Sequence, residues 1–101
     1  MINFTKYAWE EVHRYFEFKR PDGKDGLAVG ETVSSVTSMT STDSNGIDCS
    51  SAMLASVVVA NNTQVSYTLK AGTVGMSYVL DIKVVTSLGQ HLEGKVNISV
   101  I

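Results

Sequence analysis

The sequence predicts an all-β protein, an antiparallel β-sandwich of about seven strands. Apolar and polar residues alternate in several short runs, turn residues separate these runs, and none keeps a helical period. Ser, Thr and Val are abundant and there is one Pro, a composition typical of half-buried strands. A chain of 101 residues folds as one domain, and we expect an N-terminal arm at 1–10 and the sandwich at 11–101.

Helical and strand patterns overlap in the first elements. Residues 4–13 have a weak helical pattern that allows a short N-terminal helix, and helix and strand compete for residues 7–13. The stretch VHRYFEFKR then alternates, and Phe16 and Phe18 point to one side as an aromatic inner face. The PDG that follows, within residues 20–26, predicts a turn.

The middle of the chain predicts further short strands. In ETVSSVTSMTS, Val33 and Val36 differ in parity, which indicates a bulge or twist inside the strand. The segment TDSNG predicts a turn. After it, Ile47 and Cys49 alternate as a short strand would, SAML is a bend, and ASVVVA and QVSYTLK are two more strands separated by a turn at NNT.

The last quarter of the chain predicts a β-hairpin with a defined register. A three-residue loop, SLG, places Gly89 at the left-handed third position that such loops favour. The predicted register opposes Val84 with Leu92, Ile82 with Gly94, Leu80 with Val96 and Tyr78 with Ile98. All apolar residues then share one face, and a slip by one residue would move them off it.

Residues suited to catalysis or metal binding are few. His13 and His91 are isolated, so neither has a nucleophile and an orienting group at a suitable spacing. Cys49 is the sole cysteine, which excludes a disulfide within the chain, and we interpret it as a small buried hydrophobe. The stretch DSNGID is rich in oxygen ligands but lacks the spacing of a calcium loop. We therefore expect no enzyme, no cofactor and no metal.

Charge and hydropathy limit the partners. The net charge is −2, so there is no basic excess to attract nucleic acid. The longest apolar run, LASVVVA, is too short to span a membrane. The N-terminus lacks the pattern of a signal peptide, so we expect the chain to be made in a reducing cytoplasm.

The stretch LKAGTVGMSYVLDIKVVTSLGQ resembles the late strands of immunoglobulin-like and fibronectin-like sandwiches. In that resemblance Tyr78 matches a tyrosine corner, whose hydroxyl bonds back to upstream backbone. Gly72 and Gly89 fall in the turns on either side. The inter-sheet Cys pair and the core Trp of antibody domains are missing, so the likeness implies an immunoglobulin-like sandwich of the wider class.

A closer resemblance covers most of the chain. An aromatic first strand is followed by a G-[DE]-T-[IV] step, here residues 30–33, GETV. The ending AGTVGMSY, then TSLG, matches a GG-T-x-G-x-x-Y…T-x-x-G pattern in which Ala71 replaces one Gly. In these features the chain is similar to the small immunoglobulin-like virion proteins of tailed phages and prophages, of the fibre-tail adaptor type.

The resemblance implies a non-enzymatic structural or adaptor protein of a phage or prophage tail. Such a protein would join virion proteins through β-sandwich surfaces, in the bacterial host cytoplasm and then in the virion, and a homo-oligomer is left open. Phe4, Tyr7 and Trp9 are the expected partner contacts, because aromatic residues dominate interaction hot spots. The alternative, with equal weight, is that they close the open end of the sandwich.

A rival function is a carbohydrate- or ligand-binding immunoglobulin-like module. Such a module would show exposed aromatic residues beside carboxylates at a loop end.

Overall fold

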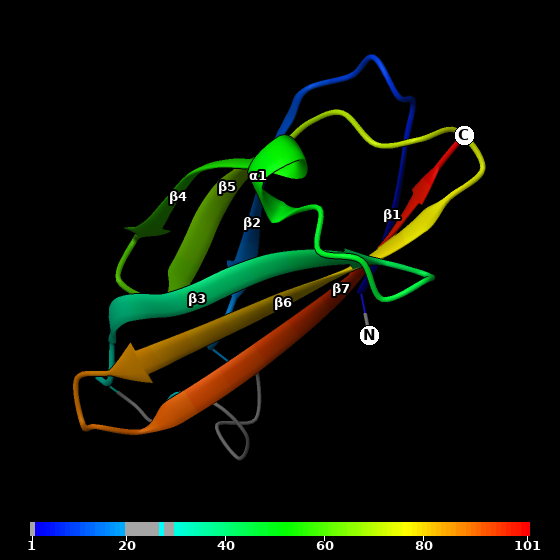
Figure 1. The fold of residues 1–101 in the computed structure, drawn as a ribbon. Helices are drawn as coiled ribbons and strands as arrows, with labels where there is room; N and C mark the ends of the chain where they lie inside the picture. Colours follow the sequence, from blue (N-terminus) through cyan, green and yellow to red (C-terminus); the bar gives the residue numbers. More distant parts are fainter. Residues whose placement is uncertain (1, 20–26, 28–29) are drawn as a thin grey trace.

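The computed structural model describes residues 2–19, 27 and 30–101, and these form two β-sheets and one short helix (Figure 1). The strands are β1 (Ile2–Lys6), β2 (Val12–Glu17), β3 (Val33–Asp43), β4 (Leu54–Ala60), β5 (Gln64–Leu69), β6 (Ser77–Thr86) and β7 (His91–Val100). Helix α1 (Ser50–Met53) lies between β3 and β4.

The larger sheet has the strand order β1-β7-β6-β3 and the smaller one the order β2-β5-β4. The pairing of β1 with β7 is parallel, and the other pairings between strands of the described chain are antiparallel. These features confirm the predicted all-β sandwich of about seven strands. Its immunoglobulin-like detail stays a prediction.

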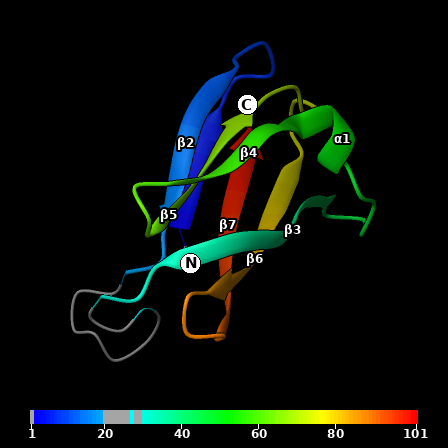
Figure 2. The ribbon, with the colours of Figure 1, turned by 90° about the vertical axis from the view of Figure 1, so that its left-hand side faces the viewer.

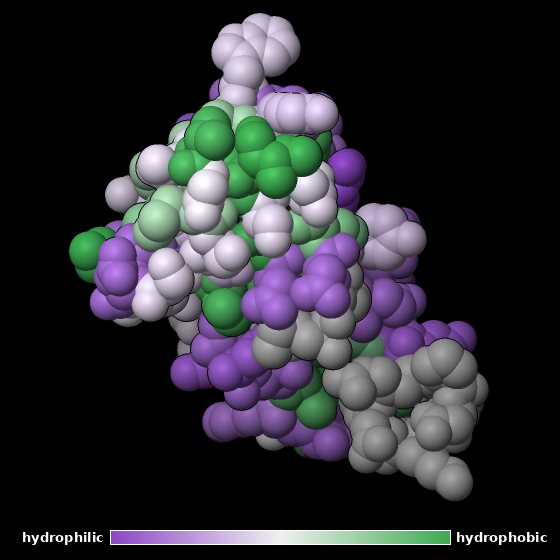
Figure 3. Space-filling view, turned by 90° about the vertical axis from the view of Figure 1, so that its right-hand side faces the viewer, coloured by the Kyte–Doolittle hydropathy of each residue, from purple (hydrophilic) through white to green (hydrophobic). Residues whose placement is uncertain are grey.

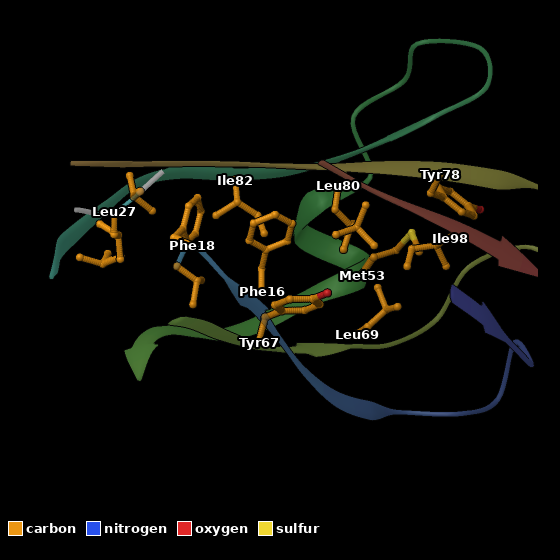
Figure 4. Packing of buried hydrophobic residues seen from close by; sticks show 14 of the residues in the cluster. Phe16, Phe18, Leu27, Met53, Tyr67, Leu69, Tyr78, Leu80, Ile82 and Ile98 are labelled. Atoms are coloured by element: carbon orange, nitrogen blue, oxygen red, sulfur yellow. The ribbon is translucent and has the colours of Figure 1, made fainter. Parts of the chain in front are cut away.

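The core lies between the two sheets, where alternate residues of each strand are buried. Figure 4 shows Phe16 and Phe18 pointing from the smaller sheet toward Leu80 and Ile82 of the larger one. The rings of Phe16 and Phe18 are 4.8 Å apart between centroids, so the predicted aromatic inner face is confirmed. Burial of this apolar surface is the main force that holds the sheets together.

The C-terminal hairpin has the predicted register. Strands β6 and β7 oppose Val84 with Leu92, Ile82 with Gly94, Leu80 with Val96 and Tyr78 with Ile98. Gly89 has a φ of 79°, the left-handed conformation expected at the third loop position. The bulge expected near Val33 and Val36 is also present, since the pairing of β3 with β6 shifts between Val33 and Ser35 and again between Val36 and Ser38.

Of the two alternatives left open at the N-terminus, the structure has the strand and not the helix. Ile2–Lys6 form β1, which gains a backbone ladder with β7, whereas an isolated helix of this length would be marginal in water. The helical signal corresponds to one turn, in which the Glu10 N–H donates to the Tyr7 carbonyl (3.1 Å). Part of the predicted arm thus lies in the larger sheet, while the domain boundary after residue 10 stays a prediction.

The prediction of a short strand at Ile47 and Cys49 is wrong. Asp48 makes a single bridge to Thr42, and the chain then turns into α1, where the Ser50 N–H donates to the Asp48 carboxylate (2.8 Å). That side-chain bond competes with strand pairing. The seventh strand of the sandwich is therefore β1. The turn predicted within residues 20–26 lies outside the described residues.

Candidate functional site

Three segments meet at one end of the sandwich: the turn between β1 and β2, the loop between β5 and β6, and the C-terminus (Figure 1). The Ile101 N–H donates to the Lys6 carbonyl (2.9 Å), and the Gly75 N–H donates to the Val100 carbonyl (2.8 Å). These bonds hold the last residues between the turn and the loop. The exposed side chains of this region, Tyr7, Trp9, Val74 and Ile101, are called the aromatic end below.

The buried side chain of Lys6 ties the turn to the loop. Its ammonium group donates to the carbonyl oxygens of Tyr7 (2.8 Å), Ala8 (3.3 Å) and Ala71 (2.5 Å). Burial lowers the pKa of Lys6, and the negative charge of Glu10 partly offsets this effect. One cation therefore fixes both loops. The sequence around Lys6 does not indicate this role.

The turn after β1 directs two aromatic side chains into solvent. Trp9 is 93% exposed and Tyr7 is 62% exposed. The Tyr7 N–H donates to the Glu10 carboxylate (2.7 Å), which closes the turn. Burial of exposed aromatic surface by a partner lowers the free energy of the system, so this turn is suited to contact with another protein.

Phe4 differs from the other two predicted contact residues. It is half-buried on β1, packs against the core and lies opposite Ile98. The guanidinium of Arg14 on β2 lies 5.6 Å from the centre of its ring. The structure thus brings Tyr7 and Trp9 together at the aromatic end and places Phe4 at the side of the sandwich.

Two aliphatic residues are also exposed at the aromatic end. Val74 in the β5–β6 loop and Ile101 at the C-terminus are exposed. Figure 3 shows strongly hydrophobic residues gathered at the upper end of this face, below a projecting aromatic side chain. Sequence patterns could not group these residues, because they come from three segments far apart in the chain.

Two residues expected to be structural shape the β5–β6 loop. The Tyr78 hydroxyl accepts a hydrogen bond from the Thr73 N–H (2.9 Å), a bond to upstream backbone of the kind that a tyrosine corner makes. Gly72 has a φ of 95°, and a Cβ there would come within 2.8 Å of Cγ2 of Val100. Both features hold the loop that carries Val74.

A buried carboxylate holds the β6–β7 turn. Glu31 accepts hydrogen bonds from the Thr86 hydroxyl and from Nε2 of Gln90 (3.1 Å to each oxygen). The Thr32 N–H donates to Oγ of Ser87 (3.0 Å), and the Ser87 N–H donates to the Thr32 carbonyl (2.8 Å). The two motifs GETV and TSLG are therefore one structural unit, which sequence spacing alone could not pair.

The described residues offer little for catalysis or metal binding. No group of three or more His, Cys, Asp or Glu among them is placed to hold a metal ion. Asp43, in the oxygen-rich stretch, accepts from the N–H groups of Asn45 and Ile47 (2.9 Å each), so its carboxylate closes a turn. His13 lies within 3.0 Å of the Thr68 hydroxyl on the surface of the smaller sheet.

No helix in the described part of the chain is both long and apolar enough to cross a bilayer.

Residues 10–99 match a family model whose description is podophage GP4 fiber-tail adaptor protein gp77. Comparison with curated proteins and with solved structures gave no match. The match begins at Glu10, so Tyr7 and Trp9 lie immediately outside it.

Proposed function

This chain belongs to the family of the podophage GP4 fiber-tail adaptor protein gp77, and from that premise we propose that it joins virion proteins through surfaces of its β-sandwich. The family makes it a structural protein of a phage tail, of the fibre-adaptor type. Its partners are then other tail proteins, which it meets in the bacterial host cytoplasm and accompanies into the virion. The free thiol of Cys49 is compatible with folding in a reducing compartment.

The observation that supports the aromatic end as the contact surface is the exposure of Trp9. The side chain of Trp9 is 93% exposed, so folding removes little of its apolar surface from water. Most of that surface is buried only when a partner covers it. Trp and Tyr are also the residues that most often carry binding energy at interfaces. Trp9 and Tyr7 lie outside the family match, so their role rests on exposure and geometry.

The surface is also held in place before a partner arrives. Lys6 fixes the carbonyl groups of the turn, and Glu10 fixes the Tyr7 N–H. Binding to a preformed surface costs less ordering entropy than binding to a loose one. The proposed role needs no catalytic group, and the isolated positions of His13 and His91 support a function without catalysis.

Binding of the fibre and tail proteins of the same phage tests this function. Isothermal titration calorimetry should show that Trp9→Ala weakens binding of one of these proteins by about thirtyfold, equivalent to a hot spot of about 2 kcal/mol. Val58→Ala is the matched control, because Val58 is an exposed apolar residue on β4 and outside the aromatic end. Equal affinities of Trp9→Ala and Val58→Ala would exclude the aromatic end as the contact surface.

A second candidate function is carbohydrate binding at the same end. Trp9 and Glu11 line a surface hollow of about 300 Å³, which is an exposed aromatic residue beside a carboxylate at a loop end. Titration of neutral oligosaccharides into the chain, followed by the fluorescence of its single tryptophan, separates the two functions. A saturable change that Glu11→Gln abolishes supports carbohydrate binding, and no change up to millimolar sugar supports the joining function.

A further inference from the structure

The edge strands of the two sheets differ in regularity. Strand β3 has two register shifts, and β4 has one, next to Ser56 with a φ of 53°. Such irregularities discourage the addition of another strand. Strand β2 pairs with β5 along its whole length without a shift, and Figure 2 shows it at the upper left of the molecule. Strand β1 is also regular but carries no acidic residue.

The outward backbone groups of β2 can be assigned from its pairing. The Phe18 N–H donates to the Thr63 carbonyl (3.0 Å), so the residues that bond to β5 are those of the same parity as Phe18. The N–H and C=O groups of His13, Tyr15 and Glu17 therefore point away from β5. They form a row of backbone donors and acceptors along the edge of the smaller sheet.

We propose that β2 pairs in antiparallel fashion with β2 of a second copy of this chain, about a twofold axis at Tyr15. In this register Tyr15 opposes Tyr15 of the second copy, and His13 opposes Glu17 in both directions. All three outward residues then form pairs that exchange two hydrogen bonds each, and the two smaller sheets become one continuous sheet. The dimer goes beyond the proposed function and does not depend on partner binding at the aromatic end.

The side chains on the outer face of β2 are complementary in this register. In this register the imidazole of His13 and the carboxylate of Glu17, a hydrogen-bond donor and an acceptor, lie directly across from one another, an arrangement that stabilises antiparallel pairs. Each is already oriented: Nδ1 of His13 lies 3.0 Å from the Thr68 hydroxyl, and the Thr63 hydroxyl donates to the Glu17 carboxylate (2.9 Å). Nε2 of the imidazole remains available for the carboxylate of the second copy. The exposed rings of the two Tyr15 side chains meet between these pairs.

Arg14 has the inward parity of Phe16, and an inward charge can protect an edge strand from pairing. Here that charge is already engaged, because the guanidinium lies over the Phe4 ring and donates to the His13 carbonyl (2.9 Å). A surface hollow of about 460 Å³ lies beside β2, and it is lined by Phe4, His13, Arg14, Tyr15 and Glu17. A carbonyl oxygen accepts two hydrogen bonds, so His13 can still pair across the axis.

Disulfide formation tests the register directly. In a Cys49→Ser background, Tyr15→Cys places two thiols across the axis at a Cα separation of about 5.5 Å, which suits a disulfide. Val58→Cys is the matched control, since Val58 and Tyr15 are similarly exposed (54% and 58%) on opposite edges of the same sheet. Under mild oxidation we expect Tyr15→Cys to form linked dimers on the order of ten times faster. Equal rates would overturn the proposal.

Exchange of the imidazole and the carboxylate tests the pairing without new thiols. His13→Glu places carboxylates opposite one another and should return the chain to monomer in sedimentation equilibrium. The double variant His13→Glu/Glu17→His restores an imidazole opposite a carboxylate on both sides of the axis and should recover the dimer. A wild-type chain that stays monomeric at about 1 mM, or a double variant that does not recover, would contradict pairing through β2.

Discussion

The ring of Phe16 on β2 lies against the backbone of Gly94 on β7, across the interior of the sandwich. A Cβ at position 94 would come within 2.5 Å of Cε1 and Cζ of this ring, far closer than carbon atoms approach. The absence of a side chain at Gly94 therefore makes room for Phe16, and this contact sets the local separation of the two sheets.

Gly94→Ala should destabilise the fold through this contact. The extra methyl group forces the buried Phe16 ring to move, and overpacking of this kind costs about 1–3 kcal/mol. Urea unfolding followed by circular dichroism measures the change. Phe16→Leu in the same chain should remove most of the additional cost, because the smaller side chain frees the space; a strictly additive double variant would show that the two residues do not interact.

Tyr78→Phe should lower the free energy of unfolding by about 1 kcal/mol, because it removes the hydrogen bond from the Thr73 N–H. The ring and its packing are kept, so the loss should be local. Amide hydrogen exchange at Thr73 should accelerate relative to amides in β6. Unchanged protection at Thr73 would mean that the hydroxyl does not hold the β5–β6 loop.

Thr86→Val should destabilise the chain by about 1–3 kcal/mol. The change keeps the shape of the side chain but removes the hydroxyl that donates to the buried carboxylate of Glu31. Thr37→Val on β3 provides a matched control, since Thr37 is exposed and its change should stay within about 0.5 kcal/mol. Thermal unfolding of the two variants side by side distinguishes a loss at Glu31 from a general effect of removing a hydroxyl.

The outer face of the larger sheet predicts a pH dependence of stability. The protonated Glu93 carboxyl donates a hydrogen bond to the Asp81 carboxylate, which raises the pKa of Glu93 above its ordinary 4.5, although Lys95 and Lys83 act in the opposite direction. The folded protein thus holds this proton more tightly than the unfolded chain does. The resulting stability is fully present below the unfolded pKa and is lost as pH rises through the higher folded pKa.

Glu93→Gln should remove that contribution. Relative to the variant, the wild-type chain is expected to lose stability as pH rises above about 4.5. Melting temperatures measured between about pH 4 and 7 check this, with Glu11→Gln as an exposed control that should follow the wild type. Parallel curves for wild type and Glu93→Gln would show that the folded chain does not hold the Glu93 proton more tightly than the unfolded chain.

Alternation along single strands made the hairpin predictable. The register of β6 with β7 follows from the need to bury Tyr78 and Leu80 on one face, and Gly89 marks the turn between the strands. The same register places Gly94 on the inner face, and a glycine there indicates that a side chain of the other sheet comes close to the backbone. Local patterns of this kind determine most of the sandwich.

Contacts between distant segments were not predictable in the same way. β1 pairs with the last strand of the chain, and Glu31 bonds to Thr86, 55 residues away. Neither pairing leaves a periodic pattern, because each depends on where the two segments meet in space. The aromatic end is similar: the sequence predicts Trp9 as a contact residue from its type, while Val74 and Ile101 can be assigned to the same end only from the fold.

The proposed function requires that this chain bind two tail proteins at once, with Trp9 in one of the two contacts. Sedimentation velocity of the chain mixed with the fibre and tail proteins of the same phage measures this most directly. The account predicts a complex that holds all three proteins and that loses one of them with Trp9→Ala, while the melting temperature of that variant stays at the wild-type value. Fibre and tail proteins that associate equally well without the chain, or with Trp9→Ala, would contradict it.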